Sequence, residues 1–357
     1  MSGRAKPASN LDPDAHATPL ATPREIADAA ARLRAGHLVA FPTETVYGLG
    51  ADALSAEAVA RVFEAKGRPA HNPLIVHVLD AAILAPGLVA SWPTRAAALA
   101  AAFWPGPLTI IVPRGPLVPL SVTGGGETVA LRSPNHAIAR ALLKAFGGPL
   151  VGPSANKSGR VSPTTAAHVR SEFDLAQVTV LDGGPCHVGI ESTVVSVVGP
   201  QATVLRPGSV LASEIAAVLR EDVVSAGALG PGALPSPGML SSHYAPRTRV
   251  ELVSTSQLPA RLATMQASTC VVLTLASDER STPNAARIAM PPEAAAYAAR
   301  LYAALREADA MSHDLILVEL PEAASASTLL PSSPWAAVLD RLTRASAGRD
   351  RSGSAAG

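Results

Sequence analysis

Short apolar runs alternate with amphipathic stretches along most of the chain, and this alternation predicts an α/β protein. Helical spacing of apolar residues begins near Pro23 and marks residues 24–36, 55–67, 95–103, 136–146, 165–173 and 213–220. Runs typical of strands cover residues 38–42, 74–79, 108–113, 128–132, 149–152, 178–182, 192–198 and 203–206. Because no regular helix separates each pair of strands, we expect a mixed, partly antiparallel sheet in a domain spanning residues 23–222.

A second domain is expected after an interruption rich in Gly, Pro and Ser. Residues 223–248 have the composition of a linker. Strand patterns at 249–253, 269–276 and 314–320 and helical patterns at 292–311 and 334–345 then predict a smaller α/β domain over residues 249–346. The polar ends of the chain, residues 1–22 and 347–357, are expected to be a disordered lead and a loose tail.

Composition excludes several classes of protein. With 357 residues, 48% of them hydrophobic and 3% aromatic, the chain can build two cores from Ala, Val, Leu and Ile. A formal net charge of +1 gives no overall field that would attract nucleic acid. The cysteines, Cys186 and Cys270, have no metal-ligand spacing, and no apolar run approaches the ~20 residues that span a bilayer. We therefore expect a soluble, cytoplasmic protein.

The segment "KGRPAHNPL" carries two cations at the end of a predicted helix. Lys66 ends that helix, Gly67 breaks it, and Pro69 favours an extended conformation for Arg68. Side chains two residues apart on an extended backbone point to the same side, so Lys66 and Arg68 are expected to reach one place, near Asn72. A compact ammonium and a guanidinium fork suit a polyanion such as a nucleoside triphosphate. The alternative is that both cations only satisfy the last carbonyls of the helix.

A second loop, "GPSANKSGRVSPTT", is rich in hydroxyl and amide groups. It follows a short strand and precedes a helix, and such groups with nearby backbone N–H donors suit phosphate and sugar oxygens. It lacks the second glycine of the phosphate-binding loop motif. The alternative is an ordinary capped turn in which Ser162 or Thr164 begins the helix.

Three further segments carry polar side chains at strand ends. Gly48, Gly50 and Ala53 match a dinucleotide-binding fingerprint, but the expected strand ends too far before them, which disfavours that interpretation. What remains there is a polar cluster of Thr43, Glu44, Thr45 and Tyr47. In "TVALR", Thr128 and Arg132 lie on one face of a strand. An arginine among apolar residues requires an anion, either a ligand carboxylate or an internal acidic side chain. "GIESTVV" fits a ligand contact or a hydrogen-bonded turn equally well.

The motifs "PTETVYGLG", "KGRPAHNPL", "FWPGPLT", "GPSANKSGRVSPT", "GIESTVV", "LRPG" and "SPGML..HYAP" occur in an order that resembles the threonylcarbamoyl-AMP synthases of the YrdC-type superfamily. The resemblance covers about residues 23–345 and the two-domain form of the family. It implies a twisted mixed sheet with helices and a C-terminal Rossmann-like domain. It also implies a nucleotidyltransferase reaction in which L-threonine, bicarbonate and ATP give L-threonylcarbamoyl-AMP and pyrophosphate. The product would pass to a separate complex that modifies tRNA.

The resemblance also implies roles for individual residues. Lys66 and Arg68 would be catalytic and would bind ATP. The other ATP-binding residues would be Asn72, Thr128, Ser154, Asn156, Ser162, Arg206 and Tyr244, with His243 beside the last. L-threonine would be bound by Thr45, His77, Arg132 and Ser192, although a core histidine and a turn cap remain alternatives for His77 and Ser192. Mg²⁺ would arrive with ATP, with no dedicated protein ligands.

Two other functions compete with this one. A non-catalytic RNA-binding module shares the fold, but the neutral net charge and few aromatic residues speak against it, and we expect tRNA contact to be weak at most. A carbamoyl-transfer domain of the kind found in hydrogenase maturation proteins would carry zinc-finger-like and acylphosphatase segments, and this chain has neither. No membrane association is expected.

Overall fold

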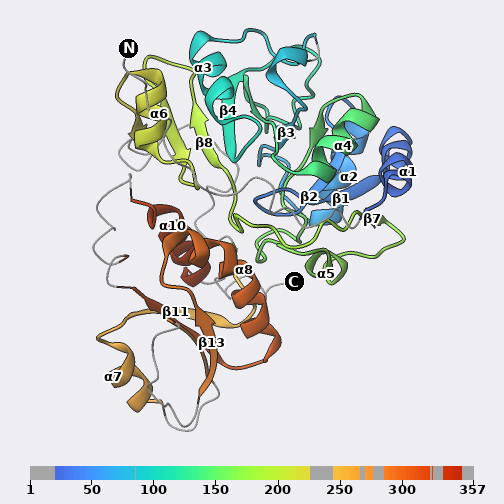
Figure 1. Cartoon of the computed structure of the whole chain (residues 1–357). Helices are drawn as coiled ribbons and strands as arrows, with labels where there is room; N and C mark the ends of the chain where they lie inside the picture. Colours follow the sequence, from blue (N-terminus) through green and yellow to red (C-terminus); the bar gives the residue numbers. More distant parts are fainter. Residues whose placement is uncertain are drawn as a thin grey trace, which may run out of the picture.

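The described residues form two separate β-sheets, one in each domain (Figure 1). The computed structural model describes residues 21–84, 86–225, 244–265, 270–275, 285–321, 324 and 333–347. The larger sheet is built within residues 38–225 and the smaller within residues 249–320. Residues 1–20 of the expected lead, residues 226–243 of the expected linker (His243 included) and residues 348–357 of the expected tail lie outside the described residues.

The larger sheet is mixed, which confirms the expectation from the strand spacing. Of its nine neighbouring strand pairs, four are parallel and five antiparallel. From one edge to the other, the order is β10 (Val224–Ser225), β9 (Thr203–Arg206), β8 (Thr193–Ser196), β4 (Leu108–Pro113), β5 (Thr128–Arg132), β3 (Ile75–His77), β6 (Leu150–Val151), β2 (Gly48–Asp52), β1 (Leu38–Phe41) and β7 (Val178–Val180).

Helices cover both faces of this sheet. They are α1 (Pro23–Arg34), α2 (Ala56–Lys66), α3 (Thr94–Phe103), α4 (Ala137–Phe146), α5 (Ala166–Arg170) and α6 (Ala212–Leu219), with a 3₁₀ turn at Ala81–Ile83. Alternate side chains of β1 point into two different hydrophobic cores, one on each face of the sheet. Val39 and Phe41 pack in the cluster formed by α1 and α4, whereas Leu38 and Ala40 pack in the cluster that includes α2 and α3. This is the two-residue periodicity of a strand buried on both faces.

Local signals set the ends of these helices. The hydroxyl of Ser55 accepts a hydrogen bond from the backbone N–H of Ala58 and begins α2, and Gly67 ends it with a left-handed φ of 60°. Both were expected from the sequence. Helix α5 differs from expectation: its N-cap is Thr165, and neither Ser162 nor Thr164 caps it. Ser162 instead donates its hydroxyl to Glu191.

Strand β2 was not anticipated, because its sequence "GLGAD" contains two glycines and no β-branched residue. The glycines have a packing reason. A Cβ built on Gly50 would lie 2.9 Å from the carbonyl oxygen of Val39 and 3.0 Å from the ring of Phe41 in the neighbouring strand β1. Gly48 and Gly50 therefore lie within a strand rather than in a phosphate-binding turn, which agrees with rejecting the dinucleotide fingerprint.

The second sheet is entirely parallel, in the order β11 (Arg249–Ser254), β14 (Leu315–Leu320), β12 (Cys270–Leu275) and β13 (Ala285–Met290). Helices α7 (Leu258–Ala263), α8 (Ala294–Ala310) and α10 (Ala336–Ser346) accompany it. The sequence did not anticipate β13, where Arg287 interrupts the apolar run, or the short helix α7. In Figure 1, α8 and α10 lie between this sheet and the larger domain.

Candidate active site

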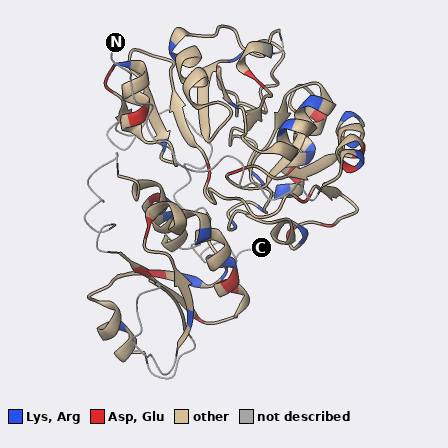
Figure 2. Cartoon of the chain, viewed as in Figure 1, with Lys and Arg blue, Asp and Glu red and all other residues tan. Residues whose placement is uncertain are grey.

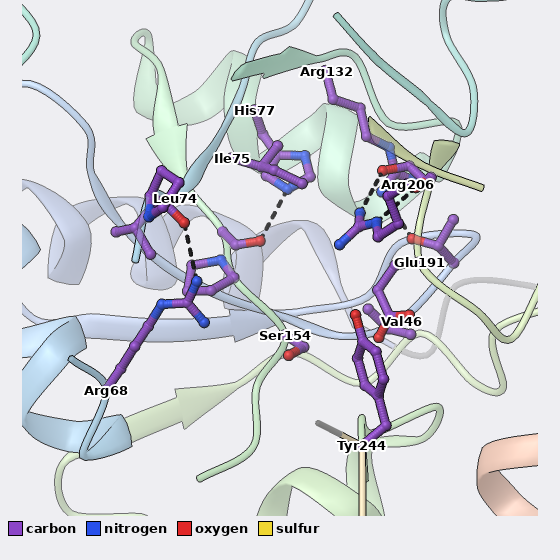
Figure 3. Close-up of a pocket in the computed structure, with 15 residues that line it drawn as sticks. Val46, Arg68, Leu74, Ile75, His77, Arg132, Ser154, Glu191, Arg206 and Tyr244 are labelled. Atoms are coloured by element: carbon purple, nitrogen blue, oxygen red, sulfur yellow. Dashed lines mark hydrogen bonds between the residues drawn. The ribbon is translucent and has the colours of Figure 1, made fainter. Parts of the chain in front are cut away.

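One pocket of the larger domain gathers most of the polar segments singled out from the sequence (Figure 3). It encloses about 500 Å³ of empty space, part of which is open to solvent. Eight of the expected site residues line it: Thr45, Arg68, His77, Arg132, Ser154, Ser192, Arg206 and Tyr244. The remaining lining residues are Val46, Pro73, Leu74, Ile75, Gly152, Pro153 and Glu191.

Strand direction explains why these side chains meet. Strands β3, β5 and β9 run in the same direction and end at His77, Arg132 and Arg206. Strand β8 runs in the opposite direction, so Ser192, immediately before it, lies at the same edge. His77 and Arg132 are direct partners in the parallel register of β3 and β5. Ligands of α/β proteins commonly bind outside such carboxyl ends.

Arg132 is buried in the wall of the pocket and has an internal carboxylate partner. Its guanidinium lies 2.7 Å from the carboxylate of Glu44, donates to the Thr45 hydroxyl at 2.8 Å and donates to the carbonyl oxygen of Gly106 at 3.2 Å. Only 4% of the Arg132 side chain and 1% of the Glu44 side chain are exposed. The internal acidic side chain considered from the sequence therefore exists, and Arg132 nevertheless also faces the pocket.

Further along the sheet, Arg206 at the end of β9 and Ser192 before β8 are hydrogen-bonded to each other. Arg206 donates through Nε to the carbonyl oxygen of Ser192 at 3.1 Å and through a terminal nitrogen to its hydroxyl at 3.2 Å. The Ser192 hydroxyl also lies 2.7 Å from that of Thr109. These contacts hold both side chains in fixed positions at the pocket wall.

Arg68 reaches the pocket from the first loop, facing Arg132 and Arg206 across it (Figure 3). It donates to the carbonyl oxygens of Asn72 at 3.5 Å and Pro73 at 3.0 Å. Among the residues that the structure describes, no carboxylate pairs with it. Burial, together with the charge of Arg206, lowers the pKa of Arg68 to about 10, while Tyr244 opposes that shift. Arg68 is therefore a cation at neutral pH, and its side chain does not bind the last carbonyls of α2 that the helix-end alternative required.

Lys66 lies behind the pocket and joins the two loops. Its buried ammonium donates to the carbonyl oxygens of Ser154 and Asn156, both at 2.5 Å. In return, the carbonyl oxygen of Lys66 accepts the N–H of Ser158. Burial, then the charge of Arg68, lowers the pKa of Lys66 well below its usual value. The two loops thus converge, but Lys66 and Arg68 do not point to the same place.

Besides Lys66, four expected ATP-binding residues do not line the pocket. Asn72 is buried beside Arg68, and Thr128 lies at the other end of β5 from Arg132. Asn156 donates its amide to the carbonyl oxygens of Lys157 and Arg160, while its side-chain oxygen is buried without a hydrogen-bond partner among the described residues. Ser162 donates to Glu191 at 2.6 Å. Nucleotide binding by these four residues stays a prediction.

Tyr244, the first described residue of the last part of the linker, closes one side of the pocket (Figure 3). Its backbone has a left-handed φ of 62°, a conformation that is uncommon for a bulky residue. The adjacent Ala245 donates its N–H to the carbonyl oxygen of Gly159 in the second loop. The end of the linker is therefore attached to that loop.

His77 carries a pH dependence that can be measured. Burial, then the charge of Arg132, lowers the pKa of His77 to about 3, although its hydrogen bond to the carbonyl oxygen of Gly152 opposes the shift. In the unfolded chain the pKa is about 6.5, so the unfolded state binds more protons between pH 6.5 and 3. The free energy of unfolding therefore falls as the pH falls through that window.

Replacing His77 by glutamine should flatten this dependence. Between pH 7 and pH 4 we expect the variant to lose about 2–3 kcal/mol less stability than the unsubstituted protein. Denaturant unfolding at the two pH values measures the difference. Parallel losses in both proteins would show that His77 is protonated in the folded state.

Charged residues of both signs occur in both domains (Figure 2). Figure 2 shows Lys and Arg residues spread over both domains with Asp and Glu residues among them, in keeping with the formal net charge of +1. Within the described ranges, no helix combines the length and apolar character needed to cross a membrane.

Fold and pocket together define a two-domain α/β protein with an arginine-lined ligand pocket at the strand ends of its larger domain. Two family models match the chain: one described as "Telomere recombination" over residues 31–208, and one described as "Threonylcarbamoyl-AMP synthase, C-terminal domain" over residues 210–347. The threonylcarbamoyl-AMP synthase of Bacillus subtilis is 39% identical over 334 residues, which cover 91% of this chain and 94% of that protein. That of Pyrococcus abyssi is 46% identical over 227 residues, covering 63% of this chain and 66% of that protein.

A solved structure has the same two-domain architecture. Sua5 from Pyrococcus abyssi, in complex with L-threonine, superposes with a TM-score of 0.80 at 36% identity, covering 91% of this chain and 95% of that one. The chain belongs to the threonylcarbamoyl-AMP synthase family, and it is an enzyme. The resemblance seen in the motifs and the expected fold class are both confirmed, and the RNA-binding alternative is set aside as the main function.

Proposed function

We propose that this protein is a nucleotidyltransferase that converts L-threonine, bicarbonate and ATP into L-threonylcarbamoyl-AMP and pyrophosphate. The observation that carries the proposal is the meeting of Arg68, Arg132 and Arg206 from three separate segments in one pocket. Three guanidinium groups around one cavity suit a ligand set with several negative charges, because arginine binds carboxylates and phosphates through paired hydrogen bonds. An amino acid and a nucleoside triphosphate together supply those charges.

Different groups of pocket residues suit the two substrates. Arg132, with Thr45 and His77 beside it, offers one cation and two uncharged polar groups, which match the carboxylate and the hydroxyl of L-threonine. Ser192, which is hydrogen-bonded to Arg206, adds a further hydroxyl to the pocket. The L-threonine bound to the Pyrococcus abyssi relative supports this assignment.

Phosphate groups fit between Arg68 and Arg206. Arg68 has only neutral carbonyl partners among the described residues, so its charge is available to an incoming anion. Ser154 contributes its small side chain at the same wall, and Tyr244 covers the site from the linker. Lys66 supports the site indirectly, because it holds the main chain of the second loop. The hydroxyl and amide groups of that loop are the remaining candidates for nucleotide contacts.

The reaction needs positioning and charge neutralisation rather than a covalent nucleophile from the protein. The amine of L-threonine combines with bicarbonate to give a carbamate and water. A carbamate oxygen then attacks the α-phosphorus of ATP, the bond to the β-phosphate oxygen breaks, and pyrophosphate leaves. Holding the reactants together can lower the barrier by about 7–11 kcal/mol. Arg68 and Arg206 would stabilise the charge that develops on the phosphates.

Mg²⁺ enters this proposal as part of the substrate Mg·ATP. Within the described residues, no group of three or more His, Cys, Asp or Glu side chains is placed to hold a metal ion. Phosphate oxygens and water commonly complete the coordination of Mg²⁺. We assign the metal no protein ligand and place the reaction in the cytoplasm.

The product is a mixed anhydride that a second reaction must consume. In this proposal a separate complex transfers the threonylcarbamoyl group to an adenosine of tRNA. The formal net charge of +1 supports at most weak direct contact with the tRNA.

A pyrophosphate-release assay on the purified full chain tests the proposed function. Release should require L-threonine, bicarbonate and Mg·ATP together, and mass spectrometry should detect L-threonylcarbamoyl-AMP. Release that continues without L-threonine would identify a nucleotide pyrophosphatase instead. Weak, salt-sensitive RNA binding with no threonine-dependent turnover would restore the binding-module alternative.

A further inference from the structure

Three side chains of the C-terminal domain reach the loops that form the pocket. Tyr302 and Arg306 project from α8, and Arg341 projects from α10, the two helices that face the larger domain in Figure 1. Arg341 and Tyr302 are buried. None of the three lines the pocket itself, but Arg341 and Tyr302 both contact Glu191, which does.

Arg341 contacts three pocket-forming segments at once. Its Nε lies 3.1 Å from the carboxylate of Glu191, one terminal nitrogen donates to the Glu191 carbonyl oxygen at 3.2 Å, and the other donates to the carbonyl oxygen of Pro207 at 2.6 Å. Its guanidinium also lies over the ring of Tyr244, 5.7 Å from the centroid. Glu191 precedes Ser192 and Pro207 follows Arg206, so a single side chain from the C-terminal domain fixes the backbone beside both.

Glu191 is the centre of this contact. Its carboxylate also accepts hydrogen bonds from the hydroxyls of Tyr302 at 2.9 Å and Ser162 at 2.6 Å. Burial alone would raise the pKa of Glu191, but Arg341, then Arg206, and the Ser162 hydroxyl together lower it. Glu191 is therefore ionised, and its charge is compensated mainly from the other domain.

The loop before Glu191 packs directly on α8. Gly189 has a φ of +73°, and a Cβ built on it would lie 2.5 Å from the Cα of Ala299 and 2.6 Å from the carbonyl oxygen of Ala298. A side chain at this position would separate the loop from the helix. The close approach shows that the two domains meet here without intervening side chains.

Arg306 contacts the second loop as Arg341 contacts its partners, through main-chain carbonyl oxygens and a carboxylate. It donates to the carbonyl oxygens of Val161 and Ser162 and forms an ion pair with Glu172 at 2.9 Å. The C-terminal domain therefore holds main-chain atoms of both segments that flank the pocket.

We propose that Arg341 is a positioning residue for the reaction: with Tyr302, it holds Glu191 and Pro207 so that Ser192 and Arg206 are correctly placed for substrate. This inference rests on the proposed function and extends it, because it makes the C-terminal domain a structural part of the active site. Ser192 and Arg206 are hydrogen-bonded to each other, so a shift of the Glu191 backbone moves both. Small displacements of positioning groups are known to cost about 100-fold in rate.

Steady-state kinetics of Arg341→Met separate positioning from a purely stabilising role. Partial unfolding lowers the apparent kcat but leaves KM unchanged, because the folded fraction retains intact sites. Displacement of Ser192 and Arg206 in a folded enzyme instead raises KM. For Arg341→Met we expect KM for L-threonine to rise at least about tenfold and kcat to fall about tenfold, with kinetics normalised to the folded fraction.

Tyr302→Phe keeps the inference testable if Arg341→Met does not fold, because it removes one hydroxyl and leaves the packing almost unchanged. We expect a threefold or larger rise in KM for L-threonine, because the Tyr302 hydroxyl no longer holds the carboxylate of Glu191. Arg261→Met is the control: Arg261 pairs with Glu251 inside the C-terminal domain, and its loss should leave KM and kcat unchanged.

Each outcome of these measurements either supports or overturns the inference. Raised KM in Tyr302→Phe or Arg341→Met, with the control unchanged, supports the inference, and partial recovery in Arg341→Lys strengthens it. Unchanged KM in the folded fraction of both variants overturns it. The unsubstituted protein tests the proposed function separately: if it shows no threonine-dependent pyrophosphate release, the proposed function fails before any variant is compared.

Discussion

Replacing Arg68 by alanine is expected to lower threonine-dependent pyrophosphate release by about 100- to 1,000-fold. The guanidinium is the cation on the first loop that faces the pocket, and its neutral acceptors leave its charge for the phosphates. Pyrophosphate release at saturating L-threonine and bicarbonate measures the loss. Because Arg68 lies at the surface of the cavity and holds no buried carboxylate among the described residues, the variant should remain folded.

Arg61→Ala is a matched control for this substitution. Arg61 lies in the same helix that leads to the first loop, and it pairs with Glu57 at 2.6 Å. Its removal should leave the rate within about twofold of the unsubstituted enzyme, in line with the small energies of exposed ion pairs. An Arg68→Ala variant with nearly full activity would remove the phosphate-binding role from the first loop.

Arg132→Met is expected to cause a large loss of stability, because it leaves the carboxylate of Glu44 buried without its cation. Breaking a buried ion pair from one side typically costs about 3–5 kcal/mol. Adding Glu44→Gln to the same chain should recover most of that free energy of unfolding. Chemical denaturation of the two variants measures this difference.

Activity should not return with stability in the double variant. The proposed contact between Arg132 and the carboxylate of L-threonine is still missing, so L-threonine affinity, measured by calorimetry, should stay at least about 100-fold weaker. Recovery of both stability and affinity in Arg132→Met/Glu44→Gln would mean that Arg132 serves only Glu44.

Helices and their ends were the most predictable part of the fold. Ser55 acts through its hydroxyl on the N–H of Ala58, and Gly67 acts through its own backbone, so the signal that begins and ends α2 is contained in the segment itself. Strand β2 could not be recognised in this way, because Gly48 and Gly50 owe their place to the ring of Phe41 in the neighbouring strand. Tertiary contacts of that kind leave no local pattern.

The candidate site was predictable in its residues more than in its geometry. Single motifs indicated anion binding by the first and second loops, and the ordered resemblance brought them together, but nothing local to Lys66 shows that it reaches Ser154, 88 positions away. Phosphate binding by Lys66 stays a prediction, and in the structure its ammonium holds two carbonyl groups. Arg132 was correctly recognised as needing an anion, and Glu44 supplies it.

The contribution of the C-terminal domain was missed, although one signal was present. Arg341 occupies the apolar stripe of α10, where Ala337, Val338 and Leu342 are buried around it. An arginine in such a place requires an acceptor, by the same reasoning that was applied to Arg132. The acceptor, Glu191, lies 150 positions away in the other domain, so no spacing in the sequence connects the two.

The junction between Arg341 and Glu191 makes domain docking and substrate binding reciprocal. If docking of the C-terminal domain improves the fit of L-threonine, then L-threonine must strengthen docking by the same free energy. A saturating substrate should therefore slow hydrogen exchange of amides in α8 and α10, helices that no substrate touches in the proposed binding mode. Hydrogen exchange in the smaller domain would then show whether substrate occupies the pocket of the larger domain.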